Sequence, residues 1–255
     1  MNLNLLIEFT KRDFTERYSG SVLGTLWTFI WPIVNIFIYV VIFSKLMGAR
    51  LPGKSATFSY GVYLIAGLVP WTAFANTVSR STSVFVDKKG IISKIRVSLP
   101  YLPLYIVLSE TVVFIITISI YMIFLILTGY PLSKSLIFIP LIYLVQQIFA
   151  FALGFFMAIF YVFIRDLREV MGIVLQIWFW FTPIVYVFNI LPDFAKKYFV
   201  YNPAYFFIKA YQDVFVFGNP PDFPSLIKIT LIGHAILILS YLFYNKLEKD
   251  IRDFL

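Results

Sequence analysis

One stretch of the chain has the letters of a phosphate-binding loop. Residues 48–55 read Gly-Ala-Arg-Leu-Pro-Gly-Lys-Ser, a formal match to the pattern whose backbone N–H groups cradle the phosphates of a nucleotide. Such a loop works between a strand and the N-terminus of a helix, whereas long apolar stretches flank this one and no alternation of strands and helices follows it. We therefore predict that the chain holds no cofactor itself, and that any ATP and Mg²⁺ are bound by a separate chain.

Ionisable side chains inside apolar stretches are the next candidates, because lipid makes them costly and such residues are often functional. Glu110 lies at a shallow depth, where water, an arginine or hydroxyl groups can reach it; a packing or gating role and proton coupling are both open. His234 could bond to a neighbouring helix or act as a ligand or relay. With one His and no Cys, no metal site is expected. Because no nucleophile, base and orienting group converge, we predict no catalytic residues and no enzymatic activity.

Aromatic residues make up 20% of the chain. Core packing and lipid contact can account for most of the 29 Phe, but each of the 17 Tyr hydroxyls needs a hydrogen-bond partner. The flat apolar face and polar edge of Tyr and Trp suit a sugar ring, so a conduit lined with them would hold a sliding polymer weakly at many places. The candidate conduit residues are Trp71, Phe74, Trp178, Trp180, Phe181, Tyr186, Phe207 and Tyr211.

The composition indicates a membrane protein. Of the 255 residues, 60% are hydrophobic and 13% are charged, about half the charged share of a soluble protein. A helix of about 20 apolar residues crosses the hydrocarbon core of a bilayer, which is roughly 30 Å thick. We predict an all-α membrane protein with six transmembrane helices in a single domain, residues 1–255. The apolar stretches are 22–44, 54–80, 96–129, 135–164, 170–192 and 229–245, which assigns spans 1–5 to residues 23–190 and span 6 to 227–246.

The distribution of basic residues indicates the orientation. The formal charge of +8 comes from 21 basic and 13 acidic residues. The basic residues flank apolar stretches, which indicates membrane topology rather than nucleic-acid binding. Thirteen basic residues lie on the side of the termini and eight on the other side. We therefore expect both termini in the cytoplasm, with residues 247–255 as a cytoplasmic tail.

The N-terminal segment, residues 1–22, is expected to form an amphipathic helix along the cytoplasmic surface of the membrane. One face of this helix carries apolar side chains, and charged pairs four residues apart support it. The apolar face consists of Leu3, Ile7, Phe14 and Tyr18, and the pairs are Glu8 with Arg12 and Asp13 with Arg17.

The segment 191–226 is rich in aromatic residues but is broken by Pro203, Pro220, Pro221 and Pro224 into pieces too short to span. Two short helices that dip into the outer leaflet and a cap on the membrane surface are both open. Lipid tolerates such a broken backbone only where protein or a water-filled cavity buries it.

Two charged cytoplasmic turns complete the pattern. Their charges could reflect topology alone, or they could dock onto a soluble partner. The first turn contains Asp87, Lys88, Lys89, Lys94 and Arg96, and the second contains Arg165, Asp166, Arg168 and Glu169.

Several short motifs together resemble one family. They are Arg12-Asp13, residues 18–27, Trp31-Pro32, residues 165–169 followed by 180–184, and the Tyr-Asn-Pro of residues 201–203. These motifs look like those of permeases from ABC transporters that export polysaccharides. The resemblance is closest to O-antigen export permeases, with teichoic acid and capsule exporters as near relatives.

The resemblance implies a bacterial inner-membrane protein that pairs with a second copy of itself and with two ATP-binding subunits. It also implies a coupling helix near residues 84–96, outer helices that gate the exit, and a polysaccharide linked to undecaprenyl pyrophosphate as the substrate. On this basis Lys11, Arg12 and Arg17 of the entrance helix are candidates to attract the pyrophosphate.

Three alternatives stay open at this stage. A small-molecule or drug exporter would share the same fold. A secondary transporter would need internal repeats and a midplane ion site, for which Glu110 is the candidate carboxylate. A membrane enzyme acting on polyprenyl-linked sugars would need convergent acids or histidines, which the sequence lacks.

Overall fold

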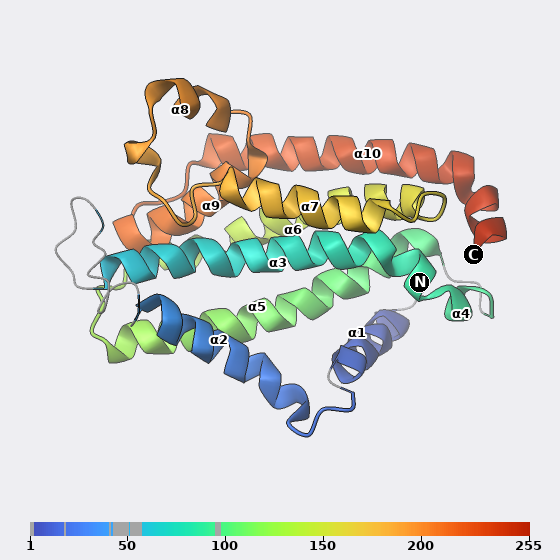
Figure 1. Cartoon of the computed structure of the whole chain (residues 1–255), viewed down its shortest axis with the longest axis horizontal. Helices are drawn as coiled ribbons and strands as arrows, with labels where there is room; N and C mark the ends of the chain where they lie inside the picture. The colour runs from blue at the N-terminus through green and yellow to red at the C-terminus, as the bar shows by residue number, and fades with distance from the viewer. Residues whose placement is uncertain (1–2, 18, 41, 43–50, 52–57, 95–97) are drawn as a thin grey trace.

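The computed structural model describes residues 3–17, 19–40, 42, 51, 58–94 and 98–255, and this part of the chain is helical and contains no strand (Figure 1). The prediction of an all-α fold is therefore confirmed. Most of residues 48–55, the stretch that resembles a phosphate-binding loop, lies outside the described residues, as do Tyr18 and Arg96.

The helices follow the order of the apolar stretches, with four shorter helices between or before them. They are α1 (Leu3–Arg17), α2 (Trp27–Phe37), α3 (Ser59–Asp87), α4 (Lys89–Ile92), α5 (Leu102–Leu127), α6 (Ile139–Tyr161), α7 (Leu167–Trp180), α8 (Asp193–Phe199), α9 (Pro203–Gln212) and α10 (Phe223–Phe254).

Within the described residues, four helical stretches are long and apolar enough to cross a membrane: Ser59–Asp87, Leu99–Leu127, Lys134–Tyr161 and Phe223–Phe254. They correspond to the second, third, fourth and sixth expected spans. The stretch Gly24–Val40 is a shorter apolar helix. Helix α7 has 14 residues, about 21 Å of helix against a hydrocarbon core of about 30 Å. The first and fifth spans therefore stay predictions.

Two helices are longer than their apolar stretches. Helix α3 continues past Arg80, the residue that marks the end of the second stretch, and ends at Asp87. Helix α10 has 32 residues, although its apolar stretch is the shortest in the sequence. Its polar end stays helical because Arg252 and Glu248 pair at 3.2 Å and because Ile251 is buried.

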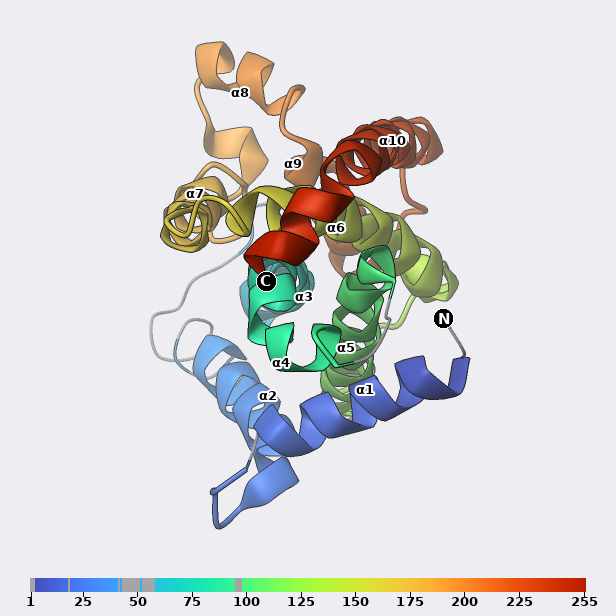
Figure 2. The same ribbon diagram turned by 90° about the vertical axis from the view of Figure 1, so that its right-hand side faces the viewer.

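Helix α3 is the central helix of the bundle. Protein buries 72% of its most apolar window, against 22% for the Leu99–Leu127 stretch and for α10. Viewed along the bundle, α3 lies among α5, α6 and α7, whereas α2 leans away at the edge (Figure 2). The other helices therefore pack around α3.

Buried apolar side chains form two clusters. The larger cluster joins α3, α6 and α9 through Phe74, Phe149 and Phe207. The second cluster includes Phe9 of α1 and Ile251 of α10, and Figure 1 shows that the two ends of the chain lie at the same end of the bundle. The expected tail is therefore part of a packed core.

At the opposite end of the bundle, Gly218 joins the segment after α9 to the segment between α5 and α6. Gly218 ends the helical turn after α9 with a φ of 72°, in the left-handed region that favours glycine. Its carbonyl oxygen accepts hydrogen bonds from the hydroxyls of Ser133 and Ser135, at 3.0 and 2.8 Å. These bonds join the α5–α6 connection to the end of α9.

The crossing of α3 and α6 provides a test of this packing. A Cβ atom at Gly154 would overlap the Cβ of Ser81, so we expect Gly154→Ala to destabilise the protein by about 1–3 kcal/mol. The measurement is the thermal unfolding of the purified protein in detergent. Gly172→Ala in α7 is the matched control, because no atom lies within 4 Å of its added Cβ. Equal losses of stability in the two variants would contradict the close approach of α3 and α6.

Candidate functional site

Four ionisable side chains from three helices meet near the end of the bundle that holds both termini. They are Asp13 and Arg17 of α1, Arg80 of α3 and Glu110 of α5, which we call the ionic cluster. Arg17 Nη2 and Arg80 Nη1 each lie 2.6 Å from Glu110 Oε1. Arg80 also pairs with Asp13, and Arg17 lies 3.6 Å from the same carboxylate. The cluster therefore ties α1 to both α3 and α5.

Neutral side chains complete the ionic cluster. Ser109 donates a hydrogen bond to Asp13 at 2.5 Å and accepts one from Arg17 at 3.3 Å. Asn76 donates to Glu110 Oε2 at 3.4 Å. Helical spacing produces this convergence, because Asn76 and Arg80 lie one turn apart on α3, as do Asp13 and Arg17 on α1.

The ionic cluster is electrically balanced, with two carboxylates and two guanidiniums. Glu110 is only 1% exposed, and a buried charge without a partner is strongly destabilising. Of the partners that the sequence leaves open for Glu110, the structure places two arginines beside it, and this double pairing supports a packing or gating role. His234 differs from expectation, since its Nδ1 lies 2.8 Å from Thr230 O of its own helix rather than reaching a neighbouring helix.

The basic residues of α1 all have carboxylate partners. Lys11 pairs with Glu8 at 2.9 Å and Arg12 with Glu16 at 2.6 Å, so the expected pairing of Glu8 with Arg12 is wrong. Arg17 belongs to the ionic cluster. An attraction of these residues to pyrophosphate stays a prediction.

One face of helix α1 packs against the rest of the protein, and another face is exposed. Phe9 and Asp13 are buried against the protein, whereas Leu3 and Ile7 of the expected apolar face are exposed. The buried face follows from the ionic cluster, which turns the Asp13 side of the helix toward α5. The exposed apolar face is available to contact a surface outside this chain.

The first charged turn is attached to α1. Lys88 lies 2.9 Å from Glu16 Oε2, and its ammonium group lies over the Tyr105 ring. The hydrogen bonds from Lys88 and Arg12 lower the pKa of the Glu16 carboxyl below its usual value. Asp87 accepts a hydrogen bond from Ser83 at 2.6 Å. The side chains of Asp87, Lys89 and Lys94 remain exposed, so the turn has a fixed base and a charged outer surface.

The second charged turn lies beside the first. Arg165, Asp166, Arg168 and Glu169 are all exposed, and the Arg165 guanidinium stacks over the Tyr161 ring at 5.5 Å. Arg168 lines a polar hollow of about 260 Å³ together with Asp13, Arg80, Asp87 and Lys88. The sequence alone does not indicate that the two turns share a surface.

Six of the eight aromatic candidates divide into a buried and an exposed group. Trp71, Phe74, Phe207 and Tyr211 are buried in the central core of this chain. Trp180 and Phe181, at the end of α7, are 59% and 66% exposed. The role of either group in a conduit stays a prediction, but only the exposed group offers its rings to a ligand without a movement of helices.

Trp178 and Tyr186 have structural partners. Trp178 donates its indole hydrogen to Asn202 Oδ1 at 2.7 Å, and Asn202 also caps α9 through the Ala204 N–H. Tyr186 donates its hydroxyl hydrogen to Trp180 O at 2.8 Å. A groove of about 470 Å³ between α7 and the α8–α9 region includes Trp178, Phe181, Tyr198 and Tyr201 among its lining residues. These bonds hold the start of α9 against α7.

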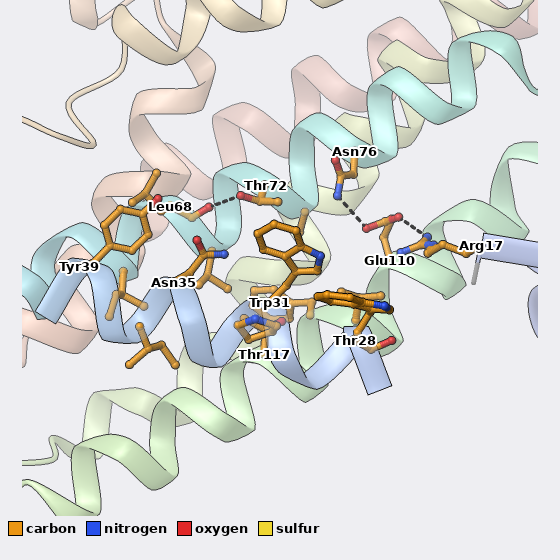
Figure 3. A pocket seen from close by; sticks show the side chains of 18 residues that line it. Arg17, Thr28, Trp31, Asn35, Tyr39, Leu68, Thr72, Asn76, Glu110 and Thr117 are labelled. Carbon is orange, nitrogen blue, oxygen red and sulfur yellow. Dashed lines mark hydrogen bonds and ion pairs between the residues drawn. The ribbon is translucent and has the colours of Figure 1, made fainter. Parts of the chain in front are cut away.

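A second hollow, which we call the α2 pocket, lies between α2, α3 and α5 (Figure 3). Its volume is about 350 Å³, within the usual range of ligand pockets. Arg17 and Glu110 of the ionic cluster form one end, and Tyr39 lies toward the other. Sequence reasoning missed this pocket, although the spacing of Thr28, Trp31, Asn35 and Tyr39 marks one polar and aromatic face of a helix.

The fold and these sites define a multi-pass helical membrane protein with a charged surface at one end of its bundle. Residues 4–216 match the family model of the ABC-2 type transporters. The chain belongs to the ABC-2 type transporter family.

The similar curated proteins extend over nearly the whole chain. A Klebsiella pneumoniae protein named O-antigen export system permease protein RfbA is 30% identical over 254 residues, which cover 99% of this chain and 95% of the relative. A Myxococcus xanthus protein of the same name is 26% identical over 248 residues, 96% of this chain and 93% of the relative. The Escherichia coli polysialic acid transport protein KpsM is 19% identical over 239 residues, 93% of this chain and 91% of the relative.

Removal of one charge tests the ionic cluster. We expect Glu110→Gln to destabilise the protein by about 3–5 kcal/mol, because two guanidiniums then share one carboxylate. The double variant Glu110→Gln/Arg17→Gln restores the charge balance and should recover part of the loss in thermal unfolding. Glu8→Gln, which removes an exposed pair, should cost less than about 1 kcal/mol. Wild-type stability of Glu110→Gln would contradict a structural role for the cluster.

The tie between α1 and the first charged turn should depend on pH. Because folding lowers the pKa of Glu16, the contribution of this carboxylate is present above its unfolded pKa of about 4.3 and is lost as the pH falls through the lower folded pKa. We expect the difference in unfolding temperature between wild type and Glu16→Gln to be largest near neutral pH and to vanish in acid. A difference in unfolding temperature that grows in acid would contradict the lowered pKa of Glu16 in the folded protein.

Proposed function

We propose that this chain is the transmembrane permease of an ATP-driven exporter that moves a lipid-linked polysaccharide of the O-antigen type across the bacterial inner membrane. The observation that carries the proposal is the similarity to two O-antigen export permeases over almost the full length of the chain. The weaker similarity to a polysialic acid transporter supports polymer export more broadly. Export of capsule, teichoic acid or a small molecule is the second candidate.

In this proposal the chain crosses the membrane six times, with α2 and α7 as the first and fifth spans. Both termini lie in the cytoplasm, and α1 lies along the inner surface of the membrane. The position of both chain ends at one end of the bundle supports an even number of spans. The exposed side chains of Leu3 and Ile7 support a lipid contact for α1.

The energy is proposed to come from two ATP-binding subunits that hold ATP and Mg²⁺ and dock on two copies of this chain. The exposed charges of the two turns, including Lys89 and Arg165, offer a surface for such docking. The pair of Lys88 and Glu16 would pass a movement of the first turn to α1, and the ionic cluster would pass it on to α3 and α5.

The polysaccharide is proposed to pass between the two copies and to leave under α8 and α9. The exposed rings of Trp180 and Phe181 at the end of α7 are suited to weak contacts with sugar rings. The buried candidates, such as Phe74, would instead hold the helices that form the conduit.

Deletion of the gene in its own bacterium tests the proposed function. We expect surface polysaccharide to disappear and lipid-linked polymer to accumulate inside the cell, because synthesis continues without export. The measurement compares antibody binding to intact and to permeabilised cells. Normal surface polysaccharide in the deletion strain would contradict the proposal.

Substitution of one exposed and one buried aromatic residue distinguishes a role in the conduit from a role in core packing. We expect Trp180→Ala to lower the export rate while thermal stability stays near that of the wild type. Phe74→Ala should cost about 3–5 kcal/mol of stability, because its ring is fully buried. Normal export by a stable Trp180→Ala variant would remove Trp180 from the conduit.

A further inference from the structure

The α2 pocket contains polar groups that lack partners. Thr28 is 3% exposed, and its Oγ1 has no hydrogen-bond partner. In the described part of the chain, Asn35 and Thr117 also line the pocket without a side-chain hydrogen bond. Because a polar group buried in an apolar setting is costly without a partner, the Thr28 hydroxyl indicates a ligand or water that can bond to it. Thr117 is half-buried and Asn35 is exposed, so both offer further polar groups to the same ligand.

The pocket also contains a large aromatic surface. Trp31 is 59% exposed, and Figure 3 shows its indole ring standing between α2 and α3, in the space bounded by Asn35, Thr72 and Asn76. Trp27 stacks obliquely beside it, with ring centroids 6.1 Å apart. An open indole face surrounded by amides and hydroxyls suits a ligand with one apolar face and polar edges.

The charge of the pocket indicates a neutral ligand. Arg17 and Glu110 are the charged residues that line it, and their pairing at 2.6 Å leaves neither charge uncompensated. Among the residues that the structure describes, an anionic group would therefore meet no free cation in the pocket. A lipid chain would leave Thr28, Asn35 and Thr117 without partners. A neutral polyhydroxylated ring meets both conditions.

The shape of the pocket fits a short piece of a chain. Its lining extends from Trp27 at the start of α2 to Tyr39, two residues past the end of α2, about 18 Å along the helical stretch Gly24–Val40. It therefore runs along the direction in which a polymer would move through the bundle.

We propose that the α2 pocket is a binding site for neutral sugar units, formed within a single copy of the chain and separate from the exposed aromatic residues at the end of α7. This inference rests on the proposed function. The sugar stacks on Trp31, and its hydroxyls bond to Thr28, Asn35 and Thr117. The ionic cluster closes the pocket at one end, so the site is linked to the helices that contact the charged turns.

Replacement of two threonines tests the proposed bonds. Thr28→Val and Thr117→Val remove hydroxyls that have no partner in the protein, so thermal stability should be unchanged or higher. The export rate of each variant, measured in cells as surface polysaccharide after synthesis is induced, should fall about three- to tenfold, as expected for a lost hydrogen bond. Thr230→Val is the matched control, because its hydroxyl bonds to Leu226 O of its own helix outside the pocket. Wild-type export by both pocket variants would overturn the proposal.

Photo-crosslinking identifies the occupant directly. A benzophenone amino acid at position 35 should form an adduct that antibodies to the polysaccharide detect and that disappears when polymer synthesis is blocked. The same group at Phe37, which is exposed on α2 and does not line the pocket, should form no such adduct. Adducts at position 35 with phospholipid or with a second permease copy alone would overturn the sugar site. Absence of export in the unmodified strain would instead overturn the proposed function.

Discussion

The structure depends on the neutralisation of one carboxylate in a membrane-spanning bundle. Glu110 is almost completely enclosed, and its two guanidinium partners come from different helices, Arg17 on α1 and Arg80 on α3. Since an unpaired charge in such a place is strongly unfavourable, these three helices cannot be positioned independently. The same constraint explains why α3 continues past Arg80 and why α1 lies against α5 with Asp13 buried.

This balanced cluster lies between the surface proposed to receive energy and the places proposed to contact substrate. On one side, Lys88 and Glu16 join the first charged turn to α1. On the other side, Arg17 and Glu110 form the end of the α2 pocket. The other half of the bundle relies on different interactions, chiefly aromatic packing around Phe74 and the bonds of Asn202 that hold α9 to the end of α7. The two halves are therefore stabilised by different kinds of interaction.

Much of the helical framework could be predicted from the sequence, because long apolar stretches have few alternatives in lipid. The features that could not be predicted depend on interactions between residues that are far apart in the sequence. The depth of Glu110 left water, an arginine or hydroxyl groups open as its partners, and which residues it meets depends on the packing of α1, α3 and α5. Composition could not separate the buried ring of Phe207 from the exposed ring of Trp180. Hydropathy also placed the end of the last apolar stretch near Asn245, whereas helix α10 continues through the charged residues beyond it, where Arg252 pairs with Glu248. The α2 pocket is formed by three helices, so the polar and aromatic face of α2 could be recognised in the sequence but the pocket itself could not.

The most direct test of the account measures whether α1 and α5 move as one body. The chain has no Cys, so spin labels attach only at introduced positions. Lys11→Cys on α1 and Val112→Cys on α5 place them on exposed sites. In complexes with the ATP-binding subunits, diluted with unlabelled permease, the account predicts the same narrow distance distribution with and without ATP, and a broad one after Glu110→Gln. A wild-type distance that shifts with ATP, or a distribution that Glu110→Gln leaves narrow, would contradict it.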